Sequence, residues 1–211
     1  MPIRATGKTV SLLVAISGAT ASGKSTFAEQ LCGRLEDLAP VLLKQDHYFR
    51  DFLEVPESER EAAVTSNHPR AVLWDELVRH LDVLKSGGQV RVPVEGTRFR
   101  RRQEPNEVGP SRVVVVEGHL LFTDERVVSL ADLKVFMDAN VHERVVRRLL
   151  RDTKSGDTSL EKATAWYRRD VIPNVSVYSE PYAGIADIVV PFERDSRTAV
   201  DAVAAWVRAN V

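Results

Sequence analysis

The chain has 211 residues, with 29 lysines and arginines against 30 aspartates and glutamates, which gives a formal net charge of -1. This length suits one well-buried domain, spanning 1–211, better than two, and the even charge balance excludes the general basic excess of nucleic-acid-binding proteins. A single cysteine, Cys32, excludes an intramolecular disulfide and a cysteine-rich zinc site.

No apolar stretch approaches the ~20 residues of a membrane span, and residues 1–9 lack the apolar run and cleavage site of a signal peptide. We therefore expect a cytoplasmic protein that has a small-molecule substrate and neither a nucleic-acid nor a membrane partner. The sequence leaves open whether copies of the chain form a homo-oligomer.

The first half of the chain predicts two strands and two helices. Residues 10–17 are an apolar run typical of a strand buried on both faces, and residues 24–38 follow with apolar residues at helical spacing. Residues 41–44 predict a second strand. The polar, acidic stretch 51–67 predicts a mobile connection with a short helix, and 72–86 an amphipathic helix that ends at a glycine pair.

The second half begins with two alternating segments around Glu95 and Gly96, which predict a small hairpin at about 89–102. Short apolar strands then again alternate with helices. We expect strands at 113–116, 134–137 and 188–190, and helices at 141–152, 159–172 and 197–209.

This alternation predicts an α/β fold with a mainly parallel sheet covered by helices on both faces. Ligands of such sheets bind at the carboxyl ends of the strands. Gly18, Asp46, Glu117 and Asp138 each come just after a predicted strand. We therefore expect the functional site at that edge of the sheet.

One segment matches the phosphate-binding pattern G-x-x-x-x-G-K-[ST] and lies between a predicted strand and a predicted helix. Glycines let successive N–H groups point into one concavity at a helix N-terminus. Lys24 can reach the β- and γ-phosphates of ATP, and the Ser25 hydroxyl can coordinate Mg²⁺. The predicted ATP-binding residues are Gly18, Ala19, Thr20, Ala21, Ser22, Gly23, Lys24, Ser25 and Thr26.

Two carboxylates are candidates for the chemistry. Glu117 follows four consecutive valines and is a candidate to position Mg²⁺ opposite Ser25; the alternative is an ordinary acid at a strand end. Asp46 is a candidate general base that accepts the proton of a substrate hydroxyl. The alternative for Asp46 is a helix or turn cap.

Two arginine clusters could bind phosphate. Arg144, Arg147, Arg148 and Arg151 lie at helical spacings, and fixed guanidinium groups can neutralise a transferring phosphoryl group; the alternative is a solvated helix face. We assign Arg147 to catalysis and Arg144 and Arg151 to ATP. The second cluster, at 98–102, fits a hairpin edge protected by charge or a nucleic-acid patch.

The residues together resemble the uridine kinase and phosphoribulokinase family of P-loop kinases over about 14–191. The similar segments, in the family's order, are 17–26, 45–50, 67–69, 92–94, 117–120, 144–152, Tyr167, Pro173 and 186–191. The resemblance implies a nucleotide-kinase-like parallel five-stranded sheet flanked by helices, with a small β-hairpin and a helical lid at about 144–165. It also makes Asp46 the family's catalytic aspartate.

The same resemblance implies an acceptor site that includes Tyr48, His68 and Tyr167. Asn67 stands where the family has an Asp that holds ribose hydroxyls. Glu95, Gly96 and Thr97 replace Tyr-Asp-Phe, and Arg100 stands in place of the base-contacting His. We therefore include Asn67, Glu95 and Arg100 among the candidate substrate-binding residues.

The sequence predicts an ATP- and Mg²⁺-dependent kinase that phosphorylates a hydroxyl of a small polar metabolite. A true uridine or cytidine kinase with altered contacts is the alternative within the family. A nucleotide-binding regulatory protein without phosphotransfer is the alternative from another class. A GTPase ranks lower because the chain has no recognisable Asn-Lys-x-Asp element.

Overall fold

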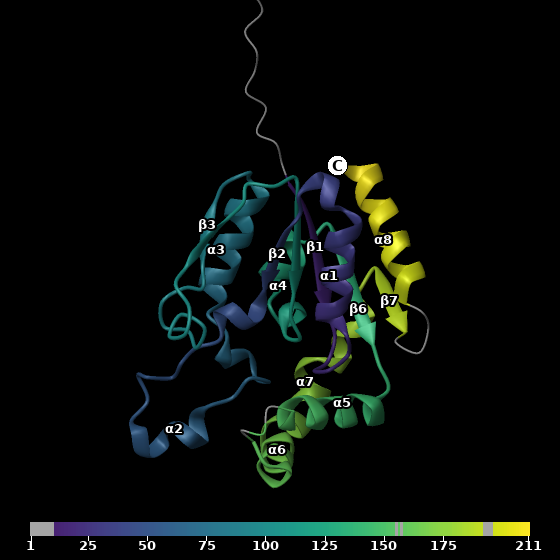
Figure 1. Ribbon diagram of the computed structural model, residues 1–211. Helices are drawn as coiled ribbons and strands as arrows, with labels where there is room; N and C mark the ends of the chain where they lie inside the picture. Colours follow the sequence, from purple (N-terminus) through teal and green to yellow (C-terminus); the bar gives the residue numbers. More distant parts are fainter. Residues whose placement is uncertain (1–10, 155, 157, 192–195) are drawn as a thin grey trace, which may run out of the picture.

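The computed structural model describes residues 11–154, 156, 158–191 and 196–211. Within these residues one parallel sheet has five strands in the order β2-β5-β1-β6-β7 (Figure 1). The strands are β1 (Leu12–Ser17), β2 (Val41–Lys44), β5 (Val113–Glu117), β6 (Leu133–Asp138) and β7 (Ile188–Pro191). The parallel five-stranded sheet predicted from the sequence is confirmed.

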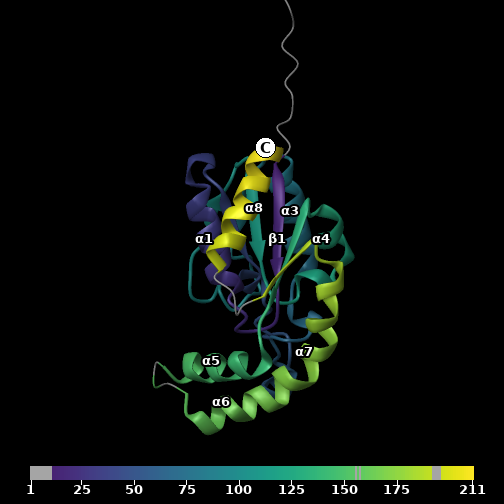
Figure 2. The same ribbon diagram turned by 90° about the vertical axis from the view of Figure 1, so that its right-hand side faces the viewer.

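The sheet is buried on both faces because alternate side chains of each strand enter two separate cores. On one face β1 packs with α1 (Lys24–Arg34) and α8 (Ser196–Asn210). On the other face it packs with α3 (Trp74–Lys85) and α4 (Glu125–Leu130). Figure 2 shows the two helix pairs on opposite sides of the strands. This double burial explains why the strands are almost wholly apolar.

Several helices lie beyond the carboxyl ends of the strands, at the bottom of Figure 1. They are α2 (Glu57–Ala63), α5 (Val141–Thr153), α6 (Leu160–Trp166) and α7 (Ile172–Tyr178). The expected single helix at 159–172 is instead α6, a π-helical turn at Tyr167–Val171, and then α7. No helix in the described part of the chain is long and apolar enough to cross a membrane.

The small hairpin exists, but its second strand lies further along the chain than expected. β3 (Val90–Val92) pairs antiparallel with β4 (Asn106–Val108), so residues 93–105 form a long loop. The prediction that the second strand of the hairpin lies before residue 102 is wrong. There Thr97 folds the chain into turns: its hydroxyl donates to Val94 O (2.7 Å) and accepts from Arg100 N (3.1 Å). These local side-chain bonds override the alternating pattern.

Candidate active site

The loop from Gly18 to Ser25 connects β1 to α1 and needs unusual backbone angles. Ala21 (φ 60°) and Gly23 (φ 90°) lie in the left-handed region, which turns neighbouring N–H groups toward one side. A Cβ on Gly18 would lie 2.6 Å from the Met137 carbonyl oxygen. The loop therefore passes too close to β6 for any side chain at position 18.

The interior of this loop fits the phosphates of a nucleotide and a hard cation. The Ser22 hydroxyl is buried without a hydrogen-bond partner in the structure. Burial lowers the pKa of Lys24, while the carboxylates of Glu117 and Asp46 oppose that shift. Ser25 Oγ donates to Glu117 Oε1 over 3.0 Å, which places two hard oxygen ligands side by side. Phosphate oxygens and water would complete the coordination of Mg²⁺.

Strand register brings the two candidate carboxylates together. Lys44, the last residue of β2, is paired with Glu117 at the end of β5, and Asp46 follows two residues later. Gln45 Oε1 accepts a hydrogen bond from Leu120 N (3.1 Å). A Cβ on Gly118 would lie 2.3 Å from that same Oε1, so glycine is required there. These contacts fix the turn that carries Asp46 against the end of β5.

Glu117 is almost fully buried, at 5% exposure. Burial raises the pKa of its carboxyl group, and the nearby charge of Lys24 is the main factor that lowers it. Glu117 thus lies buried beside the partly buried Lys24 and the exposed Asp46, in one cluster of opposite charges at the strand ends.

Two cavities meet at Lys24, Ser25 and Arg151. The outer cavity has about 510 Å³ and the central cavity about 330 Å³. The outer cavity is also lined by Ala21, Gly23, Thr26, Phe27, Met137, Arg147 and Ser196. The central cavity is also lined by Thr20, Asp46, Phe49, Ser66, Arg98, Phe99, Arg102, Glu117, His119 and Arg148. Lys24 and Ser25 therefore lie at the boundary between the two cavities.

The four arginines of α5 have different surroundings. Arg147 lines the outer cavity, and Arg151 lines both cavities. Arg148 lines the central cavity, where it donates to Thr20 Oγ1 (2.8 Å) and pairs with Asp152 (2.5 Å). Arg144 is buried instead, bonded to Glu180 (2.5 Å) and to Ala139 O (3.1 Å), and lines neither cavity. Its contacts tie α5 to the segment after α7.

None of the predicted substrate-binding residues is among the lining residues of the central cavity. Tyr48 is fully buried and its hydroxyl is 2.8 Å from His80 Nδ1. Asn67 is buried and donates to Asp170 Oδ2 (2.6 Å), while His68 Nε2 is 3.1 Å from the Tyr178 hydroxyl. Tyr167 is also buried, at 8% exposure.

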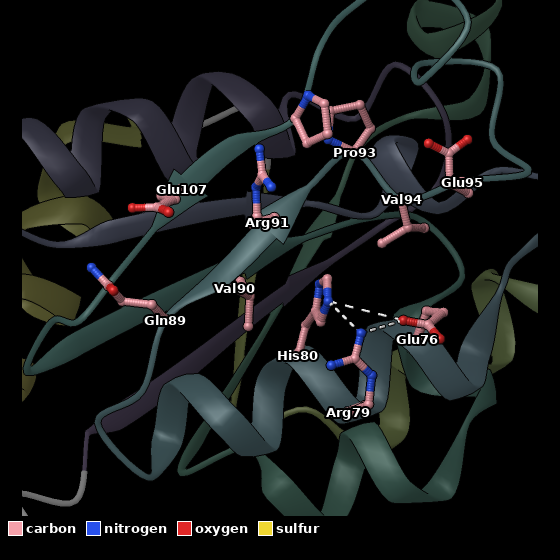
Figure 3. A pocket seen from close by; sticks show the side chains of 11 residues that line it. Glu76, Arg79, His80, Gln89, Val90, Arg91, Pro93, Val94, Glu95 and Glu107 are labelled. Carbon is pink, nitrogen blue, oxygen red and sulfur yellow. Dashed lines mark hydrogen bonds and ion pairs between the residues drawn. The ribbon is translucent and has the colours of Figure 1, made fainter.

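Glu95 and Arg100 form an ion pair with each other (2.8 Å). Glu95 lines a third cavity, of about 620 Å³, between α3 and β3. Figure 3 shows this third cavity with His80, Arg79 and Glu76 on its α3 side. Its lining includes neither Asp46 nor a residue of the 18–25 loop, so it is separate from the two cavities at the strand ends.

Several residues of the central cavity were missed as site candidates from the sequence. Ser66 and Phe99 carry no motif signal of their own, and His119 lies in the similar segment 117–120 but was not chosen as a site residue. Arg98 and Arg102 stand in a cluster that equally fits a charged hairpin edge, and Arg148 falls on a helix face that equally fits exposure to solvent. Only the fold of the 93–105 loop shows which of the clustered arginines face the cavity.

Comparison with known proteins gives a consistent result. Residues 13–199 match the phosphoribulokinase / uridine kinase family. The uridine kinase of Haemophilus influenzae (strain PittGG) is 36% identical over 201 residues, covering 93% of this chain and 94% of that protein. The uridine kinase of Clostridium tetani (strain Massachusetts / E88) is 30% identical, covering 95% and 96%.

Solved structures show the same fold. A putative fructose transport system kinase from Silicibacter sp. TM1040 has a TM-score of 0.67 at 22% identity, covering 90% of this chain and 93% of that one. The phosphoribulokinase from Rhodobacter spheroides has a TM-score of 0.63 at 17% identity, covering 87% and 70%.

Proposed function

The chain belongs to the phosphoribulokinase / uridine kinase family and is an ATP-dependent kinase of a small-molecule hydroxyl, and we propose that its acceptor is a small polar metabolite other than a nucleoside. One observation carries this proposal. Asp46, Lys24, Ser25 and Glu117 line a single cavity of about 330 Å³ whose remaining wall contains Arg98, Phe99 and Arg102.

Each of the catalytic residues has a role that its position supports. Asp46 accepts the proton of the acceptor hydroxyl as the hydroxyl oxygen bonds to the γ-phosphorus and the bond from that phosphorus to ADP breaks. Lys24 and Arg148, which both line the central cavity, stabilise the negative charge on the transferring group. Arg147 and Arg151 extend the positive charge along the outer cavity.

The residues present fit Mg²⁺-ATP. When bound, ATP supplies the phosphoryl group and Mg²⁺ neutralises its phosphate charge. Ser25 and Glu117 would hold the ion through a hydroxyl and a carboxylate, whose oxygens lie 3.0 Å apart. Among the described residues no group of three or more His, Cys, Asp or Glu could hold a metal ion, so phosphate and water oxygens are expected to supply the remaining ligands.

A uridine kinase is the second candidate, because the curated relatives named above carry that name. Against it stand the residues that replace the family's base-contacting wall. Glu95 and Arg100 pair with each other instead of lining the central cavity. The two candidates therefore differ on the acceptor side alone.

The test is ADP release from Mg²⁺-ATP with a panel of nucleosides, sugars, sugar phosphates and hydroxy acids. We expect turnover with a polar non-nucleoside acceptor and a loss of at least about a hundredfold in Asp46→Ala. Uridine or cytidine as the preferred acceptor would support the second candidate. ATP binding without turnover on any acceptor would favour a nucleotide-binding regulatory protein.

A further inference from the structure

We propose that the acceptor carries a compact anionic group, a carboxylate or a phosphate, which Arg98 and Arg102 hold in the central cavity while its hydroxyl faces Asp46. This inference rests on the proposed function and adds the substrate class. It comes from the 93–105 loop, whose residues Arg98, Phe99 and Arg102 all line the cavity that contains Asp46.

Arg98 is held rigidly in position by three neighbouring groups. Its guanidinium donates to Arg50 O (2.9 Å), Ser66 Oγ (2.7 Å) and Thr65 O (2.6 Å). It also lies over the rings of Phe49 and Phe52, at 5.8 and 5.6 Å from their centroids. Three of its five N–H donors are used, so two remain for a ligand. A fixed guanidinium of this kind loses little conformational freedom when it binds an anion.

Arg98 has no carboxylate ion-pair partner within 4.0 Å among the described residues, and neither has Arg102. Among the carboxylates, Asp170 has the largest electrostatic effect on Arg98. Its oxygens already accept hydrogen bonds from the Thr65 hydroxyl, Ser66 N and the Asn67 amide. Burial lowers the pKa of Arg98, the carboxylates of Asp170, Asp46 and Asp51 raise it, and the positive charge of Arg102 lowers it by a smaller amount. Two guanidinium groups that repel each other at one cavity wall favour a bound anion.

The basic residues near the 18–25 loop are sufficient to bind the phosphates of ATP. We therefore assign the anion bound by Arg98 and Arg102 to the acceptor. Lys24 belongs to the 18–25 loop, Arg148 and Arg151 line the central cavity with it, and Arg147 lines the outer cavity. Arg98 and Arg102 come from the hairpin loop and share their part of the wall with Asp46, Phe49 and Ser66. An anionic acceptor would be repelled by Asp46 without these two arginines.

The test compares pairs of acceptors in which a hydroxymethyl or hydroxyl group of one member is replaced by a carboxylate or a phosphate in the other, with the wild-type chain, Mg²⁺-ATP and measurement of ADP release. One pair is glycerate and glycerol; the other is ribose 5-phosphate and ribose. We expect the charged member of at least one pair to have a kcat/KM about tenfold or more above its neutral partner. The two pairs separate a carboxylate from a phosphate ligand. Equal or better turnover of the neutral members, or uridine as the best acceptor, would overturn the inference.

Arg102→Gln tests the assigned residue, with Arg101→Gln as a matched control because Arg101 is exposed and does not line the cavity. For the charged acceptor we expect Arg102→Gln to raise KM about tenfold or more with little change in kcat. Arg101→Gln should leave both unchanged. Equal effects of the two variants would contradict a specific role for Arg102. Arg98 is unsuitable as the first test because its hydrogen bonds hold three segments together.

Failure of the proposed function can be told apart from failure of this inference. If no acceptor of the panel is turned over, the proposed function fails, and binding then decides the anion site. In the presence of ADP and Mg²⁺, glycerate or ribose 5-phosphate should raise the unfolding temperature, and Arg102→Gln should abolish that increase. Equal protection by glycerol or ribose would overturn the anion site.

Discussion

The two halves of the central cavity are built in different ways. The donor half consists of Lys24 and Ser25 at the start of α1, and of Glu117, which sheet register places at the end of β5 beside β1. The acceptor half consists of loops around Asp46, Ser66 and Arg98, which side-chain hydrogen bonds hold together. Strands and a helix position the residues that act on the phosphates, whereas loops position the residues that select the acceptor.

The largest expected effect is in the donor half, from Lys24→Met. The substitution removes the ammonium whose charge interacts with those of Glu117 and Asp46, so the transferring phosphoryl group loses its central cation. We expect turnover to fall by about a thousandfold or more, with the fold retained. Steady-state ADP release together with circular dichroism checks this result. Substantial turnover in Lys24→Met would show that the phosphates lie elsewhere.

The acceptor half should respond to Arg98→Leu with a loss of stability. The change leaves Arg50 O, Thr65 O and Ser66 Oγ without their donor. We expect the free energy of unfolding to fall by about 2–4 kcal/mol. Urea denaturation measures it, and Arg102→Gln should change the same quantity by less than about 0.5 kcal/mol. An equal loss in both variants would contradict the structural role of Arg98.

We expect a smaller effect, on the pH dependence of stability, from His80, which contacts Tyr48 and Arg79. Because the Arg79 guanidinium can only donate, His80 Nε2 (2.9 Å away) accepts, and Nδ1–H donates to the Tyr48 oxygen. The ring is therefore neutral, and burial lowers its pKa to about 4. Glu76 is 4.0 Å from Nε2 and opposes that shift only partly.

The sign of the pH dependence follows from this depressed pKa. Above pH 6.5 the ring is neutral in both the folded and the unfolded chain. Between pH 6.5 and 4 the unfolded chain binds a proton that the folded chain does not, so stability falls with decreasing pH, by on the order of 2 kcal/mol. His80→Gln should show a shallower decline when denaturation is measured at pH 7 and pH 4.5. His119, with a pKa lowered by burial to about 4, adds to the same decline in both proteins.

The donor half could be predicted from the sequence to a greater extent than the acceptor half. The sheet, the 18–25 loop and the candidates Asp46 and Glu117 follow from contiguous apolar runs and a local glycine pattern, and the structure places them together. α4 and β4 were missed because they are short. Arg98 and Arg102 were missed because their position depends on the folded loop at 93–105, and Arg100 was chosen from a cluster in which its neighbours face the cavity.

Asp170 illustrates the limit most directly. It lies more than a hundred residues from Thr65 and Asn67, yet its carboxylate joins them in one buried network. Local sequence carries no signal for such a contact, because neither periodicity nor a motif relates the two segments.

The most direct test of the account measures ATP binding and turnover in the same preparation of Asp46→Asn. If Asp46 belongs to the acceptor half and acts as the base, the Kd for ATP should stay within about twofold of wild type. The kcat with the best acceptor should fall by about a hundredfold or more. Unchanged turnover, or loss of ATP binding together with turnover, would contradict the division of the cavity into a donor half and an acceptor half.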